Sequence, residues 1–248
     1  MENKQVEEYW DAIADEWEVK IGNKGDPFRC QLITPLIFDL IAGCSGNLIL
    51  DAGCGNGYLM RLLASRGYKT YGFDLSQRQL INAKKRNDSD HLIQKDIESI
   101  CSRQLPLKWP STFDIIIVSM VLDGIENINA AIESCTGLLS ENGWLIITIP
   151  HPCFYALFRF SNETFDYLFE SHHLLTMFNV TKPVIYYHRP LNIYLETILK
   201  NRLTITKIEE PVINDELKKY LKDGGRKELS CLIMGITANK LPLPRKDW

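Results

Sequence analysis

The sequence of 248 residues lacks the cysteine patterns of a metal-bound or disulfide-rich domain. Its seven cysteines are scattered, and none are paired at the C-x-x-C spacing of a zinc site or redox motif: Cys30, Cys44, Cys54, Cys101, Cys135, Cys153 and Cys231. Scattered thiols fit a reducing compartment, where cysteine packs as a small core residue. We therefore expect a cytoplasmic protein without a metal site.

Long hydrophobic runs and an excess of basic charge are also missing. The longest apolar run, 115–122, is far shorter than the roughly 20 residues that cross a bilayer. The first eight residues are polar and acidic, unlike a signal peptide. Lysine and arginine total 28 against 31 acidic residues, for a net charge of −3. This balance argues against membrane and nucleic-acid partners and favours a small-molecule partner, with no indication of oligomeric state.

Regular alternation of strands and helices is present over the first 150 residues. It predicts an α/β fold built on a doubly wound, mostly parallel sheet. The near-continuous Ile/Val run at 113–119 is typical of a strand buried on both faces. Helices are expected at 6–19, 28–41, 58–65, 76–86, 128–139, 191–200 and 214–221, and strands at 47–50, 68–73, 91–94, 113–119, 143–149, 183–187, 204–208 and 229–237.

One domain covering 1–248 is the economical expectation for a chain of this length. Its expected parts are N-terminal helices at 1–44, a ligand-binding core at 45–150, an aromatic insertion at 151–190 and a C-terminal part of the sheet at 191–248. The insertion is rich in Phe, Tyr and His and has no clean period.

A glycine-rich loop follows the first predicted strand, with the sequence Asp51-Ala52-Gly53-Cys54-Gly55-Asn56-Gly57. Glycines there allow a tight turn and a close approach of the backbone to a ligand. The spacing is G-x-G-x-G, and Tyr58 stands where the dinucleotide fingerprint needs its last glycine. Asp51 would repel a pyrophosphate and attract a cation.

Two further acids end the next two predicted strands. Asp74 lies about 20 residues beyond the loop, where an acid typically binds a ribose diol, and Asp96 follows the third strand. Three acids around a glycine turn suit an adenosine that carries a sulfonium or ammonium group and no phosphate. S-adenosylmethionine has these features.

The chain resembles the class I S-adenosylmethionine-dependent methyltransferases. The resemblance is carried by the glycine loop, by Gly72-Phe73-Asp74-Leu75-Ser76, by Asp96-Ile97, and by the segments 113–114 and 138–145. It covers residues 45–150 closely, and a subgroup resemblance extends through 151–154 and 187–190 to 209–211. It implies a seven-stranded sheet whose last strand is antiparallel.

The resemblance also implies a set of cofactor-binding residues. The loop would wrap the methionine part of the cofactor. Asp74 would bind the ribose hydroxyls, and Asp96 would bind the adenine together with the backbone of Ile97. Family members often have a His at the position of Asp123, so no acid–base role is carried over to it. The full set is Asp51, Gly53, Cys54, Gly55, Gly57, Asp74, Leu75, Asp96, Ile97, Ser119 and Met120, joined by Tyr9 from a lid-like helix and by Arg29 as a partner for the cofactor carboxylate.

Other interpretations of these N-terminal residues stay open. Tyr9, Trp10 and Trp17 at helical spacing are also typical of a helix core. Arg29 is equally compatible with an ordinary surface arginine.

The acceptor side is expected after the strand that ends near residue 149. His151 is the candidate general base there, and the alternative is a rigid turn in which its ring binds backbone. Candidate substrate-binding residues are Tyr155, Tyr187, His188 and Arg189.

The expected activity is methyl transfer to an oxygen or nitrogen nucleophile of a small molecule. Three alternatives share much of the pattern. They are an RNA methyltransferase, an NAD-dependent dehydrogenase and a cofactor-binding protein without catalysis.

Overall fold

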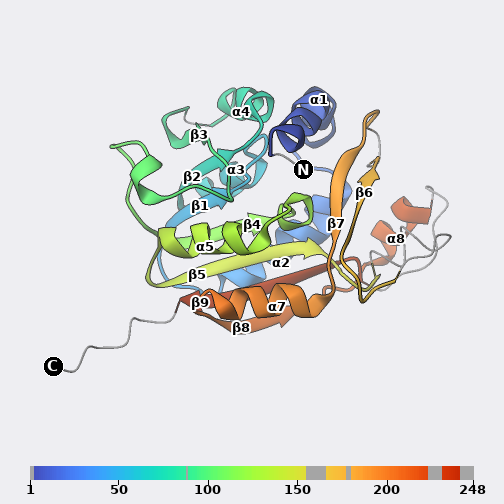
Figure 1. Ribbon diagram of the computed structural model, residues 1–248. Helices are drawn as coiled ribbons and strands as arrows, with labels where there is room; N and C mark the ends of the chain where they lie inside the picture. The colour runs from blue at the N-terminus through green and yellow to red at the C-terminus, as the bar shows by residue number, and fades with distance from the viewer. Residues whose placement is uncertain (1–2, 88, 155–165, 177–179, 223–230, 241–248) are drawn as a thin grey trace.

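The computed structural model of the chain describes residues 3–87, 89–154, 166–176, 180–222 and 231–240. Its centre is a seven-stranded sheet in the order β3-β2-β1-β4-β5-β9-β8 (Figure 1). Neighbouring strands are parallel except at β9, which is antiparallel to both β5 and β8. This arrangement confirms the expected fold class. The strands are β1 (Leu48–Ala52), β2 (Lys69–Asp74), β3 (Leu92–Gln94), β4 (Phe113–Ser119), β5 (Leu139–Pro150), β8 (Leu203–Glu209) and β9 (Ile233–Lys240).

Strand β4 shows why the sheet is covered on both faces. Ile115 and Ile117 pack in one cluster with helices α2 (Thr34–Ile41) and α3 (Tyr58–Ala64). Ile116 and Val118 point the other way, into a cluster with α5 (Ile128–Leu138) and α7 (Leu191–Lys200). Burying each such side chain contributes about 1.5–3 kcal/mol. The Ile/Val run therefore fills two cores at once, as expected for a central parallel strand.

The N-terminal segment contributes two helical pieces beside the sheet. Helix α1 (Asn3–Ile21) lies along α4 (Gln77–Lys84). The predicted helix at 28–41 forms as a π-helical turn, η1 (Arg29–Ile33), that continues directly into α2. Pro35 follows this wide turn and has no N–H to donate to the preceding turn, which accounts for the irregular hydrogen bonding.

The insertion between β5 and α7 contains a strand pair that is separate from the main sheet. Strands β6 (Ser171–Leu175) and β7 (Val184–His188) pair antiparallel. Figure 1 shows this ribbon, in orange, standing beside the main sheet. Strand β7 was predicted from the sequence and β6 was not, because residues 171–175 lack the apolar alternation of a half-buried strand. Helix α8 (Asp215–Lys222) precedes β9.

Two further facts concern membranes and thiols. Among the described residues, no helix combines the length and apolar character needed to span a bilayer. All seven cysteines lie within the described ranges, and each is a free thiol.

Candidate active site

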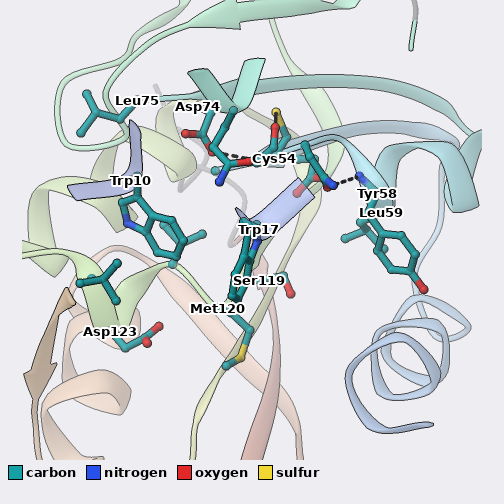
Figure 2. Close-up of a pocket in the computed structure, with 18 of the residues that line it drawn as sticks. Trp10, Trp17, Cys54, Tyr58, Leu59, Asp74, Leu75, Ser119, Met120 and Asp123 are labelled. Carbon is teal, nitrogen blue, oxygen red and sulfur yellow. Dashed lines mark hydrogen bonds between the residues drawn. The ribbon is translucent and has the colours of Figure 1, made fainter. Parts of the chain in front are cut away.

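A cavity of about 290 Å³ lies at the carboxyl ends of β1, β2 and β4 (Figure 2). Its other walls come from α1, from the segment that leads into α2, and from the β6–β7 ribbon. Ligands of open α/β sheets bind at this edge. Eleven of the thirteen expected cofactor-binding residues line the cavity, which are Arg29, Asp51, Gly53, Cys54, Gly55, Asp74, Leu75, Asp96, Ile97, Ser119 and Met120.

The glycine loop approaches the cavity most openly at Gly55. Its φ is +52°, and a Cβ added there would meet nothing within 4 Å. Gly57 also has a positive φ, of +70°, but a Cβ there would lie 2.3 Å from the side-chain nitrogen of Asn87. Gly57 therefore permits close packing against the segment after α4 and does not line the cavity. Gly55 thus borders open space, whereas Gly57 must be small because Asn87 lies against it.

Two carboxylates at the floor of the cavity have strongly perturbed acidities. Asp51 is only 2% exposed, and burial together with the charge of Asp74 raises its pKa to about 7. Burial also raises the pKa of Asp74 to about 6, although the N–H groups of Ser76 and Gly55 each donate to its carboxylate at 2.8 Å. A positive ligand would relieve the cost of ionising both groups. The charge pattern therefore fits a cation such as a sulfonium or ammonium.

Asp96 stands at the far end of this row of acids. Its Oδ1 accepts a hydrogen bond from the N–H of Glu98 at 2.9 Å, and its Oδ2 accepts one from the side-chain amide of Asn3 on α1. Ile97, beside it, is buried and also lines the cavity. Helix α1 thus contacts the acid that the resemblance assigns to the adenine.

The segment after β4 forms the opposite wall. Met120 adopts a left-handed backbone conformation with φ of 56°, and its N–H donates to the carbonyl of Thr148 at 2.8 Å. Positive φ in a residue with a side chain is strained and occurs often at functional sites. The conformation turns the chain so that Ser119, Met120 and Asp123 all face the cavity. Burial raises the pKa of Asp123 to about 6.

Helix α1 supplies two tryptophans to the cavity wall. The rings of Trp10 and Trp17 meet edge to face, with centroids 5.9 Å apart. The Arg29 guanidinium lies 4.8 Å from the Trp17 centroid and pairs with Asp26 at 2.9 Å. Its charge is therefore already balanced within the chain. Tyr9 does not line the cavity and packs against the cluster of Val6, Ile185 and Tyr187.

His151 does not face the cavity, contrary to the role expected for it. The side chain is buried, and its Nδ1 accepts from the N–H groups of Cys153 and Phe154 at 3.2 and 3.4 Å. This pattern leaves the proton on Nε2, which lies 2.6 Å from Glu210. Both ring nitrogens are engaged, so His151 has no lone pair for an acceptor. The geometry matches the alternative of a rigid turn.

The expected substrate-binding residues also lie outside the cavity lining. Tyr187 donates weakly to Glu126 at 3.5 Å, and His188 bonds the carbonyl of Tyr167 at 2.9 Å. Arg189 is buried and donates to backbone carbonyls after β4. Tyr155 lies outside the described residues. Strand β7 lines the cavity with Val184, Ile185 and Tyr186, whereas Tyr187, His188 and Arg189 follow at its end.

Several lining residues were not indicated as ligand contacts by the sequence. The helical spacing of Trp10 and Trp17 was compatible with a helix core. Their position opposite the acidic side of α1 was the one sequence signal that they face the interior of the protein. Asp123 had no acid–base role from the resemblance. The others come from elements far apart in the chain, among them Lys20, Phe28, Thr34, Gln79, Lys95, Leu175, Val184, Ile185, Tyr186 and Leu232.

Comparisons with known proteins agree with this geometry. Residues 50–147 match the family model of the methyltransferase domain. A ubiquinone biosynthesis O-methyltransferase from Glaesserella parasuis is 30% identical over 154 residues, which are 58% of this chain and 60% of that protein. The same enzyme from Paraburkholderia xenovorans is 29% identical over 140 residues, or 56% of each protein. The chain thus spans about 60% or less of these curated relatives.

Solved structures extend the similarity beyond this core. A Listeria monocytogenes protein described as an S-adenosylmethionine-dependent methyltransferase is 26% identical, with a TM-score of 0.63 over 85% of this chain and 100% of that chain. The magnesium protoporphyrin IX methyltransferase from Synechocystis, with bound S-adenosylhomocysteine, shares the fold at 16% identity and a TM-score of 0.63, over 96% of this chain and 100% of that one.

Sheet order and the strand-end carboxylates agree with these similarities. Residues 50–147 are similar to the methyltransferase domain, and most of the chain shares the fold of the class I S-adenosylmethionine-dependent methyltransferases.

Proposed function

We propose that the protein transfers the methyl group of S-adenosylmethionine to a hydroxyl oxygen of a small molecule. The observation that carries the proposal is the single cavity that brings Asp51, Asp74 and Asp96 together with the end of β4. The O-methyltransferase names of the relatives support oxygen as the acceptor atom. The net charge of −3 and the biosynthetic role named for these relatives favour a small acceptor over a nucleic acid.

The carboxylates divide the cofactor between them in this proposal. Asp74 accepts hydrogen bonds from the ribose hydroxyls, since each of its oxygens keeps a lone pair after the bonds from Gly55 and Ser76. Asp51 provides negative charge for the methionine part, and Asp96 accepts from the adenine amino group. Ser119 and Met120 lie beside the sulfonium. When bound, S-adenosylmethionine supplies an activated methyl group.

Catalysis would come mainly from alignment. Transfer requires the acceptor oxygen, the methyl carbon and the sulfur to lie in line, and a cavity that excludes water holds them there. The tryptophans of α1 and the apolar residues of β7 supply apolar walls for this cavity. An acceptor with a ring would stack on these walls.

Two measurements test the proposal. Isothermal calorimetry should show binding of S-adenosylmethionine and S-adenosylhomocysteine and none of NAD, because a pyrophosphate meets Asp51. A coupled assay for S-adenosylhomocysteine, run with a panel of small hydroxyl compounds, should then show turnover. Binding without turnover on any acceptor would point to a cofactor-binding protein, and methyl incorporation into total RNA would point to an RNA methyltransferase. Either result would overturn the proposal.

A further inference from the structure

The carboxylate of Asp123 lines the cavity but has no part in the proposed binding of the cofactor. Its Oδ1 is buried and is one of the few buried side-chain oxygens in the described residues without a hydrogen-bond partner. A buried acceptor of this kind costs about 1–3 kcal/mol unless a ligand satisfies it. In the view of Figure 2, Asp123 and Asp74 lie on opposite sides of the cavity, with Trp10 between them. The Asp123 side chain therefore lies, in this view, away from the acid proposed for the ribose.

The short turn that carries Asp123 is held rigidly. The guanidinium of Arg189 donates to the carbonyls of Leu122, Ile125 and Glu126 at 3.2, 2.6 and 2.7 Å. These three bonds fix the backbone on both sides of Asp123. Arg189, which does not reach the cavity itself, is thus a positioning residue for the carboxylate.

The neighbours of Asp123 leave it ionised near neutral pH. Burial raises its pKa to about 6, while its own N–H and the positive charge of Arg189 oppose that rise. Tyr194 of α7 also interacts with Asp123, and burial keeps that phenol protonated by raising its pKa. Asp51 and Asp74 face the same cavity from β1 and β2.

The strength of this base limits the hydroxyl that it can deprotonate. A phenol has a pKa of about 10, roughly 4 units above that of Asp123, so proton transfer can accompany attack on the methyl group. An aliphatic alcohol, with a pKa near that of water at about 16, lies about 10 units away. Trp10, Trp17 and Tyr186 place three aromatic side chains in the cavity lining, and an aromatic acceptor can pack against such rings.

We propose that Asp123 is the general base of the reaction and that the acceptor is an aromatic hydroxyl. The inference rests on the proposed function, O-methylation of a small molecule. The Asp123 carboxylate takes the hydroxyl proton while the oxygen forms its bond to the methyl carbon. The carbon–sulfur bond breaks with its electron pair going to sulfur, which leaves a neutral thioether, an aryl methyl ether and a protonated Asp123.

The test compares Asp123→Asn with wild type on two probes, catechol and the more acidic 4-nitrocatechol, at saturating S-adenosylmethionine. With catechol, kcat should fall 100-fold or more, the usual range for loss of a general base. With 4-nitrocatechol, which ionises without help near neutral pH, it should fall less than tenfold. Asp123→Glu should restore part of the catechol rate. The wild-type rate should rise with pH through about 6, and Asp123→Asn should lack that rise.

Two controls separate a base from a structural residue. Glu126→Gln removes a charge from the same turn, outside the cavity lining, and should keep wild-type rates on both probes. Calorimetry with S-adenosylhomocysteine should give the same Kd for wild type and Asp123→Asn within twofold. The absorbance of bound 4-nitrocatechol should show ionisation one to two pH units lower in Asp123→Asn, because the nearby negative charge is gone.

The possible failures are distinguishable. Equal losses on both probes, or no loss with catechol, would overturn the role of Asp123 and leave the proposed function standing. A tenfold weaker Kd for S-adenosylhomocysteine would make Asp123 a cofactor residue instead. If wild type methylates neither phenol but turns over another hydroxyl compound, the aromatic acceptor is wrong. If it turns over no hydroxyl compound, the proposed function fails and the inference fails with it.

Discussion

Replacing Asp51 by asparagine should stabilise the ligand-free protein above neutral pH while weakening its binding of S-adenosylmethionine. Asp51 is 2% exposed, at the end of β1, and faces the charge of Asp74. Among the described residues its carboxylate makes no hydrogen bond or ion pair to compensate for burial. Asparagine keeps the shape of the side chain and removes the buried charge.

The expected gain follows from the pKa. Unfolded, Asp51 releases its proton near its ordinary pKa of 3.8, whereas the folded protein holds the pKa at about 7. Between these values only the folded state keeps the proton, so the contribution to stability is full below about pH 4 and is lost as pH rises to about 7. The difference of about 3 units, at about 1.4 kcal/mol each, gives about 4 kcal/mol. We expect about half of this in practice, because the amide of asparagine also needs partners.

Thermal unfolding at constant ionic strength, at pH 5 and pH 8, checks this reasoning on protein freed of bound cofactor. A gain of about 2 kcal/mol raises the Tm by about 4–8 °C in a chain of this size. The gain should be full at pH 8 and fall to roughly 40% of that value at pH 5, since about 1.2 of the 3.2 units between the two pKa values lie below pH 5. Asp114→Asn is the matched control, since the Asp114 carboxylate accepts the N–H groups of Asn47 and Leu48 at 3.1 Å and its loss should lower the Tm. A Tm gain that does not depend on pH would refute the argument.

Three further outcomes are expected. Asp74→Ala should weaken S-adenosylmethionine binding by about 1–3 kcal/mol in calorimetry, and unchanged affinity would remove Asp74 from the ribose role. Affinity for S-adenosylmethionine should rise from pH 5 to pH 8 with release of protons, because the cation favours ionised Asp51 and Asp74, whose pKa values are about 7 and 6; a flat calorimetric profile would contradict this. His151→Ala should lower the Tm, since the ring binds Glu210 and two backbone N–H groups, yet keep kcat within a few-fold; a 100-fold loss of kcat would restore it as a base.

The sheet and most of the cofactor-side lining were predictable because their signals are local. A buried strand, a glycine loop and a helix start follow one another within 48–64, and the pairing of β1 with β2 and β4 then brings the strand ends together. Gly57 shows the limit of such a signal. The loop pattern predicts that Gly57 contacts the ligand. In the structure a glycine is needed there because any side chain would collide with Asn87.

The acceptor side was less predictable because its walls meet only in the folded chain. Strand β7 was expected, but its register decides which side chains enter the cavity, and a shift of one residue exchanges Tyr186 for Tyr187. For His151 the sequence shows two prolines around it but not the two N–H groups and the carboxylate that engage its ring. The environment of Asp123 depends on Arg189, which is 66 residues away in the chain and has no local signature.

Helix α1 joins two parts of the molecule across the cavity. On one side Asp15 pairs with Arg78 of α4 at 2.6 Å, with both side chains more than half exposed. On another, Glu16 accepts hydrogen bonds from the backbone and hydroxyl of Thr181, just before β7. Salt in the solvent weakens exposed ion pairs and leaves a buried sheet largely unaffected. The contact between Asp15 and Arg78 therefore weakens as salt is added, whereas the buried side chains of α1, such as Ile13 and Trp17, keep the helix packed on the protein at any salt concentration.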